Sequence, residues 1–403
     1  MQSGWRVGRI FGIPLLVDSS WFVIVVLFTL SYSVGLQQQG INLLLAWLIG
    51  LGTALALFGS VLLHELGHSL VARSQGITVN SITLFLFGGI ASIDQESKTP
   101  GQAFQVAIAG PAVSFLLFLL LTFAIRYIPS NFPLHGVVAE IALINGILAL
   151  FNMIPGLPLD GGQVLKALVW KVTGSRLKGL RWAARAGQFL GWGLLVFALS
   201  LFLQSRGSDV GLIWIGLIGW FVVSNATTYT RVADLQEAVR SLKALDVMTR
   251  EFRVVDANLT LQQFMDNYLL REEGLQPAFY AASDGRYRGF VDPNDLNTIE
   301  RSLWHSKRLL DIVHPLTEIP TVTESTPLTE IIDKLETLQL RHMTVLSPAV
   351  AVAGVIDRGD VVRSIAGKLR SPVPDALIQR IKEEGAYPPG LPLQAIAKAA
   401  SEP

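Results

Sequence analysis

The sequence predicts a polytopic α-helical membrane domain of six transmembrane helices with a membrane-associated β segment, followed by a soluble α/β domain. Three observations support this fold class. The chain of 403 residues is 51% hydrophobic and only 16% charged, where about 25% is usual in soluble proteins. Its apolar residues gather in runs long enough to cross a bilayer. Past residue 231 the composition changes to short helical and strand-like segments that occur twice.

The six apolar runs each approach the length of about 20 residues that a transmembrane helix needs. No small-residue cleavage site follows the first run, so we expect it to be a retained span rather than a signal peptide. Basic residues gather before the first run and after the second and fourth, which places both termini in the cytoplasm by the positive-inside rule. We therefore expect a multi-pass protein of the cell membrane. The runs lie near 14–34, 42–64, 103–125, 134–157, 187–204 and 210–229.

Charge and cysteine content exclude several classes of function. A formal net charge of +1 provides no basic surface for nucleic acid, so we expect no direct nucleic-acid partner. The absence of cysteine excludes disulfides and thiolate metal sites. Any bound metal must therefore be held by His, Asp or Glu.

The second apolar run contains the motif "HELGH", with His64, Glu65 and His68. Positions four apart share one face of a helix, so the two imidazoles can reach one metal ion, with Glu65 beside them. This is the HExxH arrangement of zinc metallopeptidases. The alternative is a buried polar cluster that bonds neighbouring helices, but ionisable side chains at membrane depth are costly unless they have a function.

A catalytic zinc site needs three protein ligands and one open position. The best candidate for the third ligand is Asp160, in the stretch "FNMIPGLPLDGGQVL" at 151–165, where two prolines break a helix. Asp160 lies at the predicted cytoplasmic end of the fourth span, and the two histidines lie at the same end of the second span. The alternative role for Asp160 is an N-cap of the helix that follows.

"HELGH" on the second span, followed by "NMIPGLPLDGG" on the fourth, resembles the site-2 protease family of intramembrane zinc metalloproteases. The resemblance covers about residues 1–370, in the branch with six spans and a C-terminal pair of cystathionine-β-synthase (CBS) domains. It implies one zinc ion per chain held by His64, His68 and Asp160, with Glu65 as the catalytic residue.

The resemblance also implies the reaction, which is hydrolysis of a peptide bond within or near the transmembrane segment of a membrane-anchored protein, such as an anti-sigma factor. The family pattern on the third span matches Gly110 and Ser114, which we place among the substrate-binding residues.

Two further features are candidates for substrate binding. The stretch 82–93, with Gly88 and Gly89, has β-type residues, and we interpret it as a strand that pairs with unwound substrate. A re-entrant or interfacial loop is the alternative. The amide of Asn152 can hold the substrate strand or stabilise an oxyanion, although a helix–helix hydrogen bond would explain it nearly as well.

The soluble part contains an internal repeat with an offset of 65 residues. "LDVM" at 245–248 recurs as "LDIV" at 310–313, and "GFVDPND" at 289–295 recurs as "GVIDRGD" at 354–360. Repetition at a fixed offset indicates two copies of one structural unit. The two copies resemble a tandem CBS pair, which implies a regulatory role.

In CBS pairs that bind an adenine nucleotide, an aspartate contacts the ribose, and Asp295 and Asp360 occupy that position here. Asp292 and Asp357 replace the hydroxyl residue that would hold the phosphate, and a carboxylate there repels phosphate. The resemblance therefore leaves two alternatives open. The pair binds an adenine nucleotide, or it serves as a homodimerisation module or binds a different ligand.

The predicted domains follow from these features. The tail is rich in proline and small residues, so we expect at most one short helix in it and otherwise disorder. The boundaries are 1–230 for the membrane metalloprotease domain, 231–244 for a charged linker, 245–305 and 306–370 for the two CBS repeats, and 371–403 for the tail.

A competing function is a CBS-regulated membrane transporter or channel with the intramembrane His, Glu and Asp residues along an ion path. The spans show no inverted repeat of the kind common in transporters, and conduction does not require three metal-type ligands beside a base. An inactive membrane scaffold is disfavoured because every chemical part of a peptidase is present.

Overall fold

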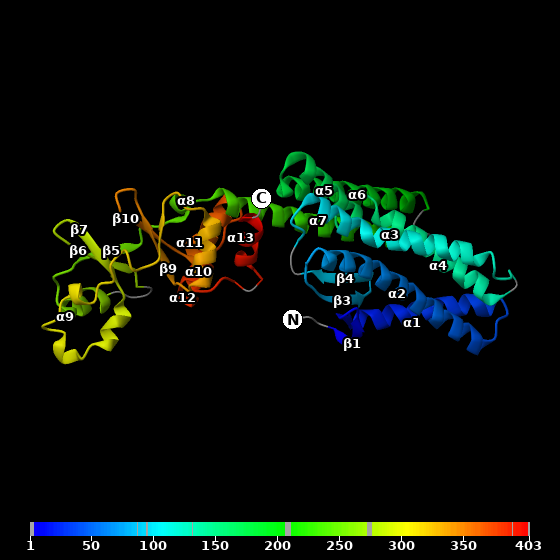
Figure 1. Ribbon diagram of the computed structural model, residues 1–403, viewed down its shortest axis with the longest axis horizontal. Coiled ribbons are helices and arrows are strands. Elements are labelled where there is room, and N and C mark those ends of the chain that lie inside the picture. The colour runs from blue at the N-terminus through cyan, green and yellow to red at the C-terminus, as the bar shows by residue number, and fades with distance from the viewer. Residues whose placement is uncertain are drawn as a thin grey trace. The chain divides into compact units, whose positions relative to one another are not determined.

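The structure is a computed structural model that describes residues 4–86, 88–93, 96–130, 132–205, 211–271, 276–388 and 390–401. The chain divides into two compact units, Met1–Arg231 and Val232–Pro403. Each unit has its own secondary structure, which is labelled in Figure 1.

Among the described residues, six helices are long and apolar enough to cross a membrane, which confirms the predicted number of spans. The first span starts later than its apolar run, because residues 13–17 form a strand and Asp18 caps the helix by accepting a hydrogen bond from Ser20 N. The last of the six helices continues through most of the predicted linker. The six are α1 Ser19–Gln38, α2 Leu43–Ser74, α3 Pro100–Ile125, α4 Pro133–Asn152, α6 Arg176–Gln204 and α7 Gly211–Ser241, and α5 Asp160–Thr173 is a shorter helix between α4 and α6.

The predicted β segment is part of a four-stranded sheet with the order β1-β2-β3-β4. The stretch 82–93, expected as one strand, contains a turn at Leu86 and contributes to two antiparallel strands, with Phe87 outside the described residues. The two other strands come from the N-terminus, where Phe11 and Gly12 form a hairpin turn with positive φ angles, as two-residue hairpins require. The strands are β1 Trp5–Ile10, β2 Ile13–Val17, β3 Val79–Phe85 and β4 Gly88–Ile93.

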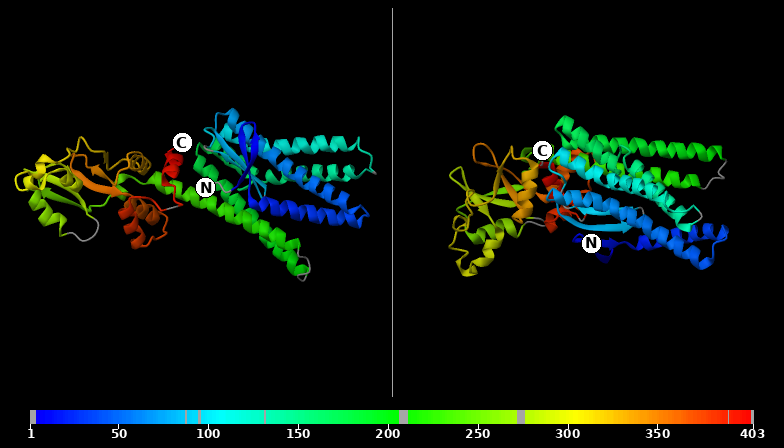
Figure 2. Two further views of the ribbon diagram at one scale, coloured as in Figure 1. Left: turned by 90° about the horizontal axis from the view of Figure 1, so that it is seen from below. Right: turned by 45° about the vertical axis from the view of Figure 1, so that its right-hand side comes forward.

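The sheet packs against the C-terminal half of α2. Ile13 of β2 and Ile82 of β3 are buried in one apolar cluster with Leu66 and Ala72 of α2. Figure 2 shows the strands gathered at one end of the spanning helices. β4 is an edge strand, so one side of its backbone is not paired within the sheet.

The C-terminal unit repeats one topology. Each copy has three strands, of which the first two are parallel and the last two antiparallel. The copies also exchange equivalent contacts, since Thr249 pairs with Val355 and His314 pairs with Phe290, and both pairs are related by the 65-residue offset. The elements are β5 Phe252–Asp256, β6 Ala278–Ser283 and β7 Arg286–Val291 with α8 Ala244–Val247 and α9 Leu261–Phe264, then β8 Thr321–Thr323, β9 His342–Leu346 and β10 Val352–Asp357 with α10 Leu328–Thr337 and α11 Arg358–Lys368.

The prediction for the tail was wrong. It forms two helices, α12 Asp375–Glu384 and α13 Leu393–Ser401. Ile378, Ile381 and Leu393 are each at most 2% exposed and belong to the core that covers the second repeat. The apolar residues at helical spacing therefore decide the structure of the tail. The prolines do not prevent helix formation, because none of them lies inside α12 or α13.

Candidate metal centre

Helix α2 presents the HExxH motif at the end of the membrane unit where the sheet lies. His64 and His68 are one helical turn apart on one face, and they are only 4% and 8% exposed. Glu65, between them in sequence, is half-buried. The helix is apolar around these three residues, so the site is an isolated polar cluster in an apolar environment.

Asp160 is the first residue of α5 and reaches the histidines from a different part of the chain. The chain before it turns tightly, and a Cβ at Gly161 or Gly162 would lie 2.4 or 2.3 Å from backbone atoms of residues 153–157. The turn is held to α6 by a hydrogen bond from Leu157 N to Ala183 O. The N-cap of α5 is Leu159, so Asp160 does not have the capping role considered as its alternative.

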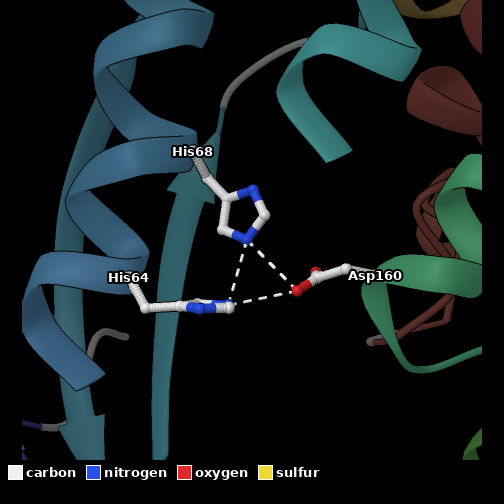
Figure 3. Close-up of side chains that lie close together, drawn as sticks. All are labelled: His64, His68 and Asp160. Carbon is white, nitrogen blue, oxygen red and sulfur yellow. Dashed lines mark hydrogen bonds and ion pairs between the residues drawn. The ribbon is translucent and has the colours of Figure 1, made fainter. Parts of the chain in front are cut away.

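The three side chains point toward one another (Figure 3). Asp160 Oδ2 lies 3.1 Å from His64 Nε2 and 3.4 Å from His68 Nε2, and the two Nε2 atoms are 3.3 Å apart. Ligands about 2.0–2.1 Å from a tetrahedral zinc ion lie roughly 3.3 Å from one another. The separations of the three atoms therefore fit a single metal ion, and the set is recognisable as a group that can hold one.

The hydrogen bonds on the far side of each ring orient the metal-facing nitrogens. His68 Nδ1 donates to the backbone oxygen of Val106 at 2.6 Å, because a carbonyl can only accept, and so the neutral ring has a lone pair on Nε2. His64 Nδ1 lies 2.9 Å from the Ser114 hydroxyl, which is fully buried. Such partners fix the ring orientation in metal sites. The lone pair on His68 Nε2 and the carboxylate oxygen of Asp160 both face the position that a metal ion would occupy.

Helix α3 also provides the space for the site. A Cβ at Gly110 would lie 2.2 Å from His68 Nε2 and 2.7 Å from His64 Nε2. Gly110 and Ser114 were predicted from the family pattern as substrate-binding residues, and the structure places both directly against the histidines. The role of Val106 was missed, because its contribution is a backbone carbonyl and has no residue signature.

Strand β4 lies against Glu65. A Cβ at Gly89 would lie 2.5 Å from Glu65 Cγ, so only glycine allows the glutamate and the strand to approach so closely. Gly88 begins the strand and has a φ of 134°, which side chains rarely adopt. Gly89 therefore borders the proposed catalytic residue, and contact of Gly88 and Gly89 with substrate stays a prediction.

Asn152 is the last residue of α4, and no hydrogen bond joins its amide to the described residues of the metal centre. Its proposed role in substrate binding stays a prediction. A helix–helix hydrogen bond of the kind considered for Asn152 is made instead by Asn145, whose Nδ2 donates to Ser60 Oγ at 2.9 Å. Asn145 is fully buried.

The two aspartates proposed for nucleotide binding have different surroundings. Asp295 is partly exposed and lies 2.7 Å from His314 Nε2. Asp360 is 1% exposed, and its Oδ1 lies 2.9 Å from the ammonium of Lys382 in α12. Burial, together with the neighbouring Asp357, raises the pKa of Asp360 to about 6, and Lys382 acts in the opposite direction. The tail therefore covers the second aspartate, while the first remains accessible.

A His-His-Asp donor set beside a glutamate, in a bundle of membrane helices, is the arrangement of a membrane-embedded metallopeptidase. Comparison with known proteins supports this class. Peptidase family M50 matches residues 52–139 and 130–197, and the CBS domain family matches residues 311–367.

Two relatives extend the similarity over nearly the whole chain. Protein sll0528 of Synechocystis sp. is 39% identical over 369 residues, which are 91% of this chain and 96% of that protein. Rip3 of Mycobacterium tuberculosis is 32% identical over 373 residues, 91% of this chain and 93% of Rip3. The term zinc metalloprotease appears in both names. The solved site-2 protease from Methanocaldococcus jannaschii is 30% identical, with a TM-score of 0.41, and covers 56% of this chain and 95% of that one.

The chain belongs to peptidase family M50, the site-2 protease family. It is a peptidase with six candidate membrane spans and a C-terminal CBS domain.

Proposed function

We propose that this protein is an intramembrane zinc metalloprotease that hydrolyses a peptide bond within or near the transmembrane segment of membrane-anchored substrates. The observation that carries the proposal is the convergence of His64, His68 and Asp160 beside Glu65. It occurs where a spanning helix meets an edge strand. A soluble hydrolase has no reason to place this set on an apolar spanning helix.

The metal is assigned as zinc on the donor set. Two imidazoles and one carboxylate are a usual ligand set of catalytic zinc in peptidases, and the space over Gly110 leaves room for the ion. When bound, zinc polarises the scissile carbonyl and acidifies the attacking water. His64, His68 and Asp160 hold the ion, while Val106 and Ser114 orient the two rings.

Glu65 is proposed as the general base and acid. It follows the first ligand directly in sequence, is half-buried and lies against Gly89 of β4, and it is not part of the donor set of His64, His68 and Asp160. There it can take the proton of the attacking water and later deliver that proton to the leaving amine.

The edge of β4 is proposed to hold the unwound substrate as an added strand, because a peptide in a helix hides its carbonyls in internal hydrogen bonds. A proline scan of a model substrate tests this. Residues of a paired strand alternate in the direction of their N–H groups, so proline should block cleavage at every second position near the scissile bond. The intervening positions act as matched controls, and a helical period or uniform tolerance would exclude strand pairing.

The substrate class and the regulation belong to the same proposal. We expect a membrane-anchored regulator such as an anti-sigma factor as substrate, both termini in the cytoplasm, and activity that is modulated by the CBS pair, either through an adenine nucleotide or through dimerisation. Cells that express Glu65→Gln in place of the wild type should accumulate a membrane-bound stub of the substrate. Identical membrane proteomes in the two strains would count against the proposal.

A further inference from the structure

Three charged side chains outside the metal centre form a cluster that the proposed chemistry does not use. Glu96 Oε2 accepts a hydrogen bond from Lys166 Nζ, and the Arg176 guanidinium lies 2.5 Å from the same oxygen through its NH2 group and 3.0 Å through Nε. Lys166 is only 6% exposed. We call these three residues the Glu96 cluster.

The cluster joins elements that are far apart in sequence. Glu96 lies three residues beyond the end of β4, in the connection to α3. Lys166 lies in α5, the helix that begins with the proposed ligand Asp160, and Arg176 begins α6. One carboxylate, three positions past β4 in the sequence, therefore contacts both the helix that carries the third ligand and the start of α6.

The α5–α6 side of the cluster is itself rigid. A Cβ at Gly179 would lie 2.4 Å from the backbone oxygen of Lys166, so the two helices are in close contact at this point. The Arg176 guanidinium lies 5.9 Å from the centre of the Trp170 ring. The Lys166 and Arg176 side of the cluster is therefore closely packed, and Glu96 is held against it.

The carboxyl of Glu96 is ionised at neutral pH. Partial loss of hydration around the Glu96 carboxyl would raise its pKa, but the neighbouring cations Lys166 and Arg176 outweigh this effect and hold that pKa below its usual range. Among the described residues, Glu96 is the carboxylate that pairs with Lys166, and a buried ammonium that loses its partner is left with an uncompensated charge. These contacts therefore hold Glu96, Lys166 and Arg176 in a fixed arrangement.

We propose that the Glu96 cluster sets the position of β4 relative to Asp160 and so selects which peptide bond of the bound substrate is cut. The inference rests on the proposed function, since it requires a substrate strand on β4. If the substrate strand shifts by one residue along β4, every one of its side chains turns to the other face. A misplaced substrate strand is therefore expected to shift by two residues, which keeps its side chains on the same faces. Glu96, Lys166 and Arg176 are positioning residues in this account and do not touch the substrate.

The test uses the full-length protein in lipid vesicles with a model transmembrane substrate, and mass spectrometry of the products. Lys166→Met keeps the length of the side chain and removes its charge. We expect kcat to fall at least tenfold with little change in KM, and a second product displaced by two residues. Lys166→Arg should restore the single product. Lys171→Met, an exposed position on the same helix, should behave as the wild type.

Glu96→Gln provides a second variant should Lys166→Met fail to fold, because Glu96 has a largely accessible side chain, 53% exposed. It should also give the displaced product. A wild-type product pattern in folded Glu96→Gln and Lys166→Met would overturn the inference, as would lowered activity with an unchanged cleavage site. Failure of the wild type to cleave any transmembrane substrate would instead contradict the proposed function itself.

Discussion

Replacement of Gly110 by alanine changes one methyl group and should abolish metal binding. The added carbon would lie 2.2 Å from His68 Nε2 and 2.7 Å from His64 Nε2, whereas unbonded heavy atoms prefer separations of about 3.5 Å. At least one ring must therefore withdraw by about 1 Å. Metal-ligand distances tolerate changes of about 0.2 Å, so the donor set would no longer fit one ion.

The expected magnitude follows from this displacement. We expect zinc affinity to fall by more than about 100-fold, beyond the effect of losing an outer hydrogen bond, and turnover to fall at least as much. Alanine is favoured over glycine inside a helix by roughly 0.5–1 kcal/mol, so a weakened α3 would not explain the loss.

The assay is the zinc content of purified protein after dialysis against a chelator, together with its turnover of a transmembrane substrate. Gly101→Ala is the matched control, because it lies on the same helix and a Cβ there has no neighbour within 4 Å. It should retain zinc and activity. Retention of zinc by Gly110→Ala at the wild-type level would refute the assignment of this space to the metal.

Two predictions concern the C-terminal unit. Lys382→Met should lower the free energy of unfolding by about 3 kcal/mol, because it removes the nearest counter-ion of buried Asp360 and leaves the Arg363 guanidinium at 4.0 Å. Exposed Lys368→Met should change that free energy by less than about 0.5 kcal/mol. A raised carboxyl pKa favours the folded state only at low pH, so the loss should be larger at pH 8 than at pH 5; urea unfolding with equal losses for both variants would contradict this prediction. Burial lowers the pKa of His342 below its usual value, so the unfolded chain binds more protons at this residue below about pH 6.5. The contribution of His342 to the stability of this unit should therefore fall between pH 7 and pH 5, opposite in sign to that of Asp360, whose pKa is raised. His342→Gln should raise the stability at pH 5 relative to pH 7 when compared with the wild type, and parallel curves would exclude the effect.

The metal centre could be predicted from sequence because its residues carry distinctive signals. HExxH has the spacing of one helical turn, and Asp160 lies in a break between helices, where a buried carboxylate has few structural roles. The structure adds what has no such signal, namely the Val106 carbonyl and the approach of Gly89 to Glu65. Backbone contacts of this kind depend on how distant elements pack.

Two features of the fold show where sequence patterns fail. Residues 13–17 are as apolar as the span that follows them, so a prediction from hydropathy assigns the strand and the helix to one apolar run. Asp18 is the polar residue that marks the boundary between them. In the tail, the proline content led to a prediction of disorder where two amphipathic helices form. Nothing in the sequence around Lys382 indicates that it pairs with Asp360, 22 residues earlier. The strand at 13–17 and the helices of the tail both depend on contacts with residues that are distant in the sequence.

The central claim is that three side chains hold a zinc ion and that Glu65 performs the proton transfer. The most direct measurement is zinc content and substrate cleavage in wild-type protein, Glu65→Gln and Asp160→Ala, each purified under identical conditions. The wild type should contain one zinc per chain and cleave the substrate, Glu65→Gln should contain one zinc without cleavage, and Asp160→Ala should lose zinc. Full zinc occupancy in Asp160→Ala, or cleavage by Glu65→Gln, would contradict this claim.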